Sequence, residues 1–103
     1  MKDVRRAIQR RLKPALAWTA QAKDGTATRA RVLSSIEPVL LELWRAGVLA
    51  GRVRPEAYFV RCDATTTTAA DVAAGRLIVL VGYATHLPAE FDLLEVALPV
   101  RVR

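Results

Sequence analysis

The chain has 103 residues and a formal net charge of +6, with 52% hydrophobic and 25% charged residues. This length fits one domain that buries roughly 60–70% of its unfolded surface, and the composition excludes an intrinsically disordered chain. Cys62 is the only cysteine, so an intramolecular disulfide is excluded and no metal-binding pattern remains. The longest apolar run, LIVLVGYA, is shorter than the roughly 20 residues of a membrane-spanning helix, and no signal-peptide pattern is visible, so we expect no membrane insertion.

Positive charge is concentrated in the first half of the chain. Residues 1–54 carry 12 basic and 4 acidic side chains, whereas residues 55–103 carry 4 basic and 6 acidic ones. This asymmetry suits a nucleic-acid surface, a contact with an acidic protein, or two complementary faces of one subunit. A solvated helix face explains it as well. The candidate basic contact face lies on the first expected helix and consists of Arg5, Arg6, Arg10, Arg11 and Lys13.

The first 22 residues have the pattern of an amphipathic helix. Val4, Ile8, Leu12 and Leu16 recur every four positions, which predicts a helix over residues 3–22 with one buried stripe. Pro14 should kink or break this helix, because proline removes one backbone hydrogen bond.

A turn-like segment, AKDGTAT, separates this helix from a second one. Thr26 or Thr28 offers an N-cap oxygen, and the apolar period predicts a helix over residues 28–46. Gly47 fits the left-handed position that ends a helix. Pro38 is the weak point of this helix, and a serine just before it could cap a shorter one.

The second half of the chain is typical of strands. AYFVRC predicts a strand over residues 57–62, RLIVLVGY a buried central strand over 76–83, and AEFDLLEVAL a third over 90–98. Between the first two, AADVAAG allows only a short helix, with Gly75 as its stop. We therefore predict a single α+β domain, residues 1–103, with two amphipathic helices packed on a small mixed or antiparallel sheet.

The C-terminal tail after this sheet is a candidate for pairing with another subunit. VRVR has the period of two of an exposed edge strand, and no hairpin partner is visible for it in the sequence. Unpaired backbone groups of this kind can add to the sheet of a neighbour. A frayed basic end is the alternative. The candidate strand-donor residues are Pro99, Val100, Arg101, Val102 and Arg103.

We find no pattern that predicts catalysis. His86 stands in a loop with no adjacent nucleophile, and Asp63 beside Cys62 would raise the pKa of the thiol rather than activate it. Glu90 and Asp92 would share one solvated strand face, and there is no phosphate-binding loop or nucleophile motif. We therefore expect no catalytic residue, no cofactor, no metal site and no enzymatic activity.

A small basic binding module for nucleic acid or for an acidic protein, such as a cap or adaptor of a tail-like assembly, is the alternative function. VRRAIQRRLK supports it by placing arginines along a helix. However, Trp18 and Trp44 fall on or near the apolar stripes and offer no stacking platform. The sequence therefore argues against nucleic acid as the partner.

Several segments, taken in their order along the chain, resemble one family. They are LELWRAGVLAG at 41–51, EAYFVRCD at 56–63, the threonine run with Asp71, GRLIVLVGYA at 75–84 and LPAEF at 87–91. Together, from about Val4 to Leu98, they resemble the C-terminal domain of the sheath proteins of contractile phage tails and contractile injection systems. The resemblance implies a structural subunit, or a minimal or truncated relative of one, that self-assembles into rings or a helical tube by strand exchange. It implies assembly in the cytoplasm into a virion or phage tail-like particle.

The resemblance also implies partners and roles. The partners would be other copies of the chain and possibly the tail tube or other sheath-like subunits. The donated arm would be Pro99 to Arg103, and the receiving sheet would comprise Tyr58 to Cys62, Leu77 to Gly82 and Phe91 to Leu98. Members of this family normally carry outer domains and an N-terminal arm, which this sequence lacks. We therefore expect a cap, a subunit of a reduced tube or an excised domain.

Overall fold

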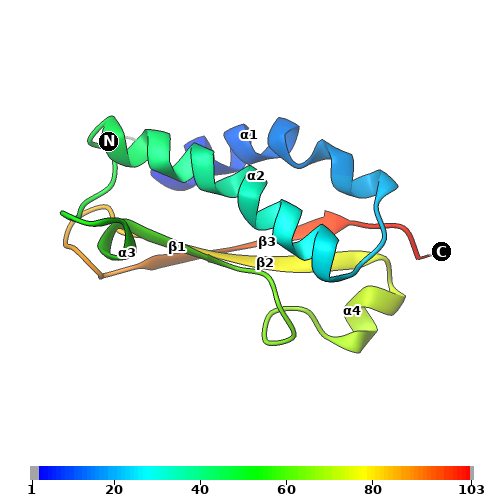
Figure 1. The fold of residues 1–103 in the computed structure, drawn as a ribbon. Coiled ribbons are helices and arrows are strands. Elements are labelled where there is room, and N and C mark those ends of the chain that lie inside the picture. The colour runs from blue at the N-terminus through cyan, green and yellow to red at the C-terminus, as the bar shows by residue number, and fades with distance from the viewer. Residues whose placement is uncertain (1–2, 103) are drawn as a thin grey trace.

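The computed structural model describes residues 3–102, in which two long helices lie on one side of a three-stranded sheet (Figure 1). The helices are α1, Val4–Ala15, and α2, Thr26–Arg45. The strands β1, Tyr58–Arg61, β2, Arg76–Tyr83, and β3, Asp92–Pro99, pair antiparallel in the order β1-β2-β3. The molecule measures 41 × 24 × 23 Å. The predicted α+β class is confirmed, with the antiparallel form of the sheet.

The first helix is shorter than the predicted range of 3–22. Asp3 caps α1 by accepting a hydrogen bond from the Arg6 N–H, and α1 ends at Ala15. Pro14 cannot donate to the carbonyl of Arg10, and the α-helix stops one residue after it. A 3₁₀ helix, η1, Ala17–Gln21, continues the chain. The predicted break is therefore present, and the single predicted helix is two elements.

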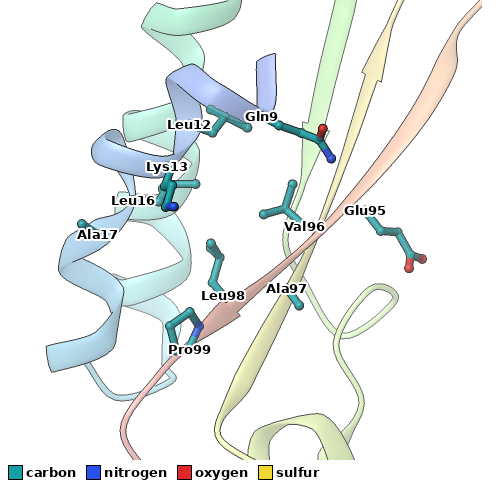
Figure 2. Close-up of a pocket in the computed structure, with 10 residues that line it drawn as sticks. All are labelled: Gln9, Leu12, Lys13, Leu16, Ala17, Glu95, Val96, Ala97, Leu98 and Pro99. Carbon is teal, nitrogen blue, oxygen red and sulfur yellow. The ribbon is translucent and has the colours of Figure 1, made fainter. Parts of the chain in front are cut away.

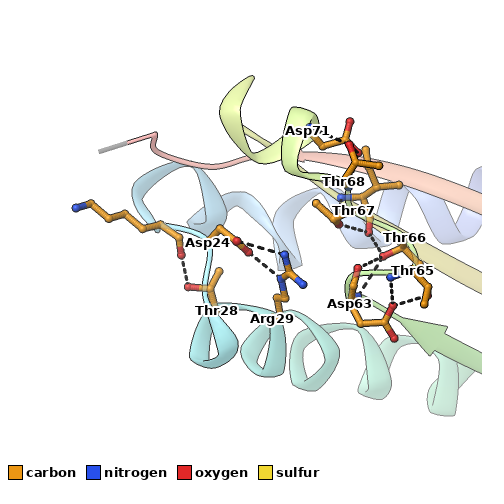
Figure 3. A network of polar contacts seen from close by, with 11 residues as sticks. Asp24, Thr28, Arg29, Asp63, Thr65, Thr66, Thr67, Thr68 and Asp71 are labelled. Carbon is orange, nitrogen blue, oxygen red and sulfur yellow. Dashed lines mark hydrogen bonds and ion pairs between the residues drawn. The ribbon is translucent and has the colours of Figure 1, made fainter.

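The start of α2 corrects the predicted threonine cap. Gly25 is the N-cap residue and no side chain caps the helix. The Thr28 hydroxyl instead donates to the carbonyl of Lys23, in the turn before the helix. Arg29 holds the same turn through an ion pair with Asp24, at 2.8 Å between Nε and Oδ1 (Figure 3). Thr28 is thus engaged in the turn, and Thr26 is the first residue of α2 rather than its cap.

The second helix continues past Pro38 and ends where Gly47 predicted. Ser35 does not cap a shorter helix, because its hydroxyl donates to the carbonyl of Arg31. Gly47 has φ 80°, and the Val48 N–H donates to the carbonyl of Leu43 at 3.0 Å. This is a Schellman ending, which requires a left-handed residue at that position. A short helix, α3, Arg54–Ala57, then leads into β1.

The central strand carries most of the buried face of the sheet. Its inward side chains pack under the two helices and, with residues of α1, α2 and β3, form one core: Ile8, Leu12, Val32, Ile36, Leu40, Leu77, Val79, Val81 and Leu94 are all 2% exposed or less. On the other face, Gly82 lies under the Phe59 ring, where an added Cβ would be 2.0 Å from a ring carbon. Phe59 meets Phe91 edge to face at 5.0 Å.

The short helix α4, Ala69–Ala73, precedes β2 (Figure 1). Thr68 and Asp71 form a capping box at its start. Asp63 accepts hydrogen bonds from Thr65 in the preceding turn. Gly75, with φ 79°, ends α4 and opens β2. Among the described residues, no helix combines the length and apolarity needed to cross a membrane.

Candidate assembly site at the outer edge of the sheet

The outer edge of β3 is the longest stretch of open sheet backbone in the described residues. In an antiparallel pair, backbone groups alternate between the partner strand and the free side. The Arg5 guanidinium donates to the carbonyl of Leu93 at 3.0 Å, so Leu93 directs its backbone groups to the free side. The same alternation turns the N–H and C=O groups of Glu95 and Ala97 to the free side.

This edge is closed at its two ends and open between them. Arg5 binds Leu93 at one end, and at the other the Arg101 N–H donates to the carbonyl of Ala22 at 2.7 Å. Within residues 3–102, no hydrogen bond reaches the free side of Glu95 to Pro99 from another segment. We call this stretch the open edge. A strand of about five residues could pair with it.

An apolar groove of about 560 Å³ runs beside the open edge (Figure 2). Leu12 of α1 and its C-cap residue Leu16 line one wall, and Val96 and Leu98 of β3 line the other. The Glu95 side chain points away from the helix, to the opposite face of the sheet. The groove therefore places the free backbone groups of β3 next to apolar side chains, of which Val96 is half-buried and Leu12, Leu16 and Leu98 are buried.

The tail is held by its own chain as far as Arg101. Pro99 pairs with Arg76 as the last residue of β3. The Val100 N–H donates to the carbonyl of Gly75 at 2.9 Å, and the Val100 side chain is 7% exposed. No partner for these groups is visible in the sequence, but the fold brings the carbonyls of Gly75 and Ala22 to either side of the tail.

The rest of the predicted donor is exposed or lies outside the description. Val102 is 63% exposed, and Arg103 lies outside the described residues. The hydrogen bonds of the tail within its own chain do not test whether the tail pairs with another chain. The donor role of Pro99 to Arg103 therefore stays a prediction, now with the requirement that Val100 and Arg101 leave their own chain.

The candidate basic contact face is divided by the fold. Arg5 binds the edge of β3, and Arg11 forms an ion pair with Glu42 of α2. Arg6 lies 3.8 Å from Asp3 in an exposed pair. The remaining two members of the face, Arg10 and Lys13, are exposed and form no ion pair within the described residues. The role of this face in binding a partner stays a prediction. Arg10 and Lys13 are the members whose charges are not paired within the described residues.

Both tryptophans pack against the core rather than form a platform for bases. The Trp18 indole N–H donates to the Ser35 hydroxyl at 3.3 Å, and Arg31 covers its ring at 3.9 Å. The Trp44 indole N–H donates to the carbonyl of Gly51 at 3.0 Å. Each indole is thus committed to its own fold, and no observation favours the nucleic-acid alternative.

The candidate chemical groups are not brought together. Cys62 is buried, and this burial raises the pKa of its thiol. His86 lies exposed in the loop between β2 and β3. Within residues 3–102, no three His, Cys, Asp or Glu side chains are grouped to hold a metal ion. The main interaction that the surface around β3 offers is therefore backbone hydrogen bonding at the open edge.

Comparisons with known proteins agree with this description. No protein-family model matches the chain, and no curated protein is significantly similar to it. The chain is 36% identical to a protein in the sheath complex of an extracellular contractile injection system, PVC, in the contracted state, with a TM-score of 0.71 over 85% of this chain and 25% of that chain. The chain is a domain of the contractile sheath protein family.

Two further structures give the same answer for the sheath domain. A chain of the anti-feeding prophage baseplate is 37% identical, with a TM-score of 0.62 over 86% of this chain and 24% of that chain. A chain of the anti-feeding prophage helical sheath in the contracted state is 36% identical, with a TM-score of 0.61 over 88% and 25%. The sheath domain thus spans about a quarter of the length of these relatives.

The groove of the sheath domain was not visible in the sequence. Leu12 and Leu16 were expected as core residues of the helix stripe, and β3 as one strand of the receiving sheet. The signal that identifies the open edge is strand order, which depends on long-range pairing. The alternation of exposed Glu95 and Ala97 with half-buried Val96 in β3 is the only local trace of it.

Proposed function

We propose that this chain is a structural, non-enzymatic subunit or assembling domain of a contractile tail-type sheath. It associates with copies of itself by strand exchange. The open edge of β3, bounded by Arg5 and Arg101 and flanked by an apolar groove, is the observation that carries the proposal. Similarity to proteins of sheath complexes supports it. We infer that the assembly is part of a tail-like particle.

The tail of a second copy matches this groove in pattern. Side chains of neighbouring strands that stand opposite each other share a face of the sheet. The valines at 100 and 102 would lie beside Val96 and Leu98, toward α1, and the arginines beside Glu95 on the other face. The open edge and the tail each comprise about five residues, or roughly 17 Å of strand.

Such a contact uses different surfaces on the two partners. It is heterologous, and heterologous contacts close into rings or continue as helical filaments according to the rotation between copies. Both outcomes suit a sheath. The exposed side chains of Arg10 and Lys13 remain the candidate contact with an acidic partner such as a tube.

Blocking the open edge with a proline tests this proposal. The Ala97 N–H faces the free side, so Ala97→Pro removes a donor needed by a docked strand without breaking the ladder to β2. We expect a folded monomer that forms no rings or tubes, as seen by sedimentation and negative-stain electron microscopy. Deleting residues 99–103 is a poorer test, because it removes the buried Val100 side chain.

Ala69→Pro is the matched control. It places the same residue at the first position of α4, where proline is tolerated, away from the open edge. The control should assemble as the unmodified chain does. If Ala97→Pro assembles as well as Ala69→Pro, the open edge of β3 is not the assembly site.

A further inference from the structure

We propose that the C-terminal tail is held in the free subunit by an intramolecular latch, and that opening this latch is a required step of assembly. The inference rests on the proposed strand exchange and adds a control on it. The latch consists of the backbone of Val100 and Arg101 bound between the carbonyls of Gly75 and Ala22. A subunit with a closed latch cannot donate its tail.

Both sides of the tail backbone are occupied. The Val100 N–H donates to Gly75, which continues the ladder between β2 and β3 by one more pair. The Arg101 N–H points to the opposite side and donates to Ala22, and Arg101 forms a parallel bridge with Lys23. The tail is therefore the middle of three short segments. It has no free side with which to pair in a neighbouring sheet.

Side-chain packing adds to the latch. The Val100 side chain is part of the core cluster. A Cβ built on Gly75 would lie 3.2 Å from the Val100 carbonyl oxygen and 3.3 Å from a methyl carbon of Val102. The tail thus lies directly on Gly75, and the close approach depends on the missing side chain at that position.

The latch and the donated strand compete for the same groups. An N–H that donates to Ala22 or Gly75 is not available to a neighbour, and Val100 cannot fill its own core and another subunit's groove together. Free subunits therefore remain mostly in the latched state and assemble slowly. A subunit whose latch is opened gains the capacity to donate.

Gly75→Ala opens the latch without changing the donated sequence. Its Cβ crowds the tail, and alanine at φ 79° is strained. Gly47→Ala is the matched control, because Gly47 has φ 80° and nothing lies within 4 Å of its added Cβ. The two variants share the backbone strain and differ in contact with the tail.

Two measurements on these chains test the latch. Amide hydrogen exchange on dilute monomer should show protected Val100 and Arg101 N–H groups in the unmodified chain and in Gly47→Ala, and loss of that protection in Gly75→Ala. The concentration at which assembly begins should be about tenfold lower for Gly75→Ala than for Gly47→Ala, as expected for two opened backbone hydrogen bonds. Equal concentrations, or unprotected tail amides in the unmodified chain, would overturn the inference.

A disulfide lock tests the same point in the opposite direction and does not depend on Gly75→Ala folding. Lys23 and Arg101 are bridge partners, so Lys23→Cys with Arg101→Cys can form a cross-link. The oxidised chain should remain monomeric and should assemble after reduction. Assembly of the oxidised chain would overturn the latch. If no chain assembles under any condition, the strand-exchange proposal fails, and the exchange data alone decide whether the tail is latched.

Discussion

Besides the outer edge of the four-residue strand β1, the sheet has two places where a strand lacks a full partner, and the chain treats these two differently. β1 pairs with β2 only from Leu80 to Tyr83, which leaves the first half of β2 without a strand on that side. There, Thr66 and Thr67 take the place of the missing strand (Figure 3). Thr67 accepts from the Ile78 N–H at 2.9 Å and donates to its carbonyl at 3.0 Å. No such side chain covers Glu95 to Pro99 on β3 within the described residues.

The difference separates an edge closed by its own chain from one whose backbone groups stay unpaired within the described residues. Uncovered sheet edges invite uncontrolled association, and proteins usually block them. On β2, the hydroxyl of Thr67 blocks the edge from within the same chain, and Thr67 is only 3% exposed. On β3 the backbone groups stay free beside an apolar groove. An edge left open in this way fits the strand exchange proposed above.

Removing the hydrogen bonds by which Thr67 closes the edge of β2 should have the largest effect on the free energy of unfolding. Thr67→Val keeps the shape of the side chain and leaves the part-buried Ile78 N–H without its partner, at a cost of about 1–3 kcal/mol. The free energy of unfolding, measured by urea denaturation, gives the loss. Thr65→Val is the control, because Thr65 is exposed and bonds only within its turn.

The same variant should change how the chain associates. With a second edge open, Thr67→Val should form aggregates that Ala97→Pro does not suppress. If the double variant stays monomeric, the threonines on β2 contribute to stability and not to the choice of edge. Sedimentation of the single and double variants distinguishes the two results.

The sequence predicted those features that depend on short-range pattern. The apolar run of β2, the stops at Gly47 and Gly75 and the break near Pro14 follow from periodicity and backbone preference. The cap of α2 could not be predicted, because a threonine hydroxyl can either accept from a helix N–H or donate to a carbonyl, and that of Thr28 donates to Lys23.

The candidate site was less accessible to prediction because it depends on contacts between distant segments. Thr67 reaches Ile78 across 11 residues, and Arg5 reaches Leu93 across 88. The tail binds Ala22, which no local pattern connects with Arg101. The alternation of VRVR predicted an exposed edge strand with no visible partner, whereas Val100 and Arg101 bind Gly75 and Ala22, partners that emerge only from the tertiary fold.

A smaller effect is expected where the closed side of the sheet is tied to α2. The Tyr58 hydroxyl donates to Glu37 at 2.9 Å, and Glu37 also binds Arg54. Tyr58→Phe should cost about 0.5–1.5 kcal/mol at neutral pH. Tyr83→Phe is a suitable control, because no hydrogen bond within the described residues involves the Tyr83 hydroxyl. An equal loss in both variants would mean that the bond to Glu37 contributes nothing specific.

The pH dependence sharpens this test. Burial, and then the hydrogen bond to Glu37, raise the pKa of Tyr58 to about 12 from its ordinary value of 10.0. Between these values the unfolded chain loses the tyrosine proton while the folded chain keeps it, so Tyr58 makes stability fall as pH rises. Tyr58→Phe should weaken that fall. A series of urea denaturations from pH 9 to about pH 12 measures it.

The smallest expected effect concerns charge beside the open edge. Arginines of a docked tail would lie on the face of the sheet that carries Glu95, so Glu95→Gln should weaken assembly by about 0.2–1 kcal/mol per contact, as for other exposed ion pairs. Glu90→Gln makes the same change of charge in the loop before β3. The difference between the two should shrink toward 1 M salt, where charges are screened within about 3 Å. If both variants assemble equally well at low salt, the arginines of the tail do not face Glu95. The tail would then dock with its valines toward solvent, or the docked strand would come from a different segment.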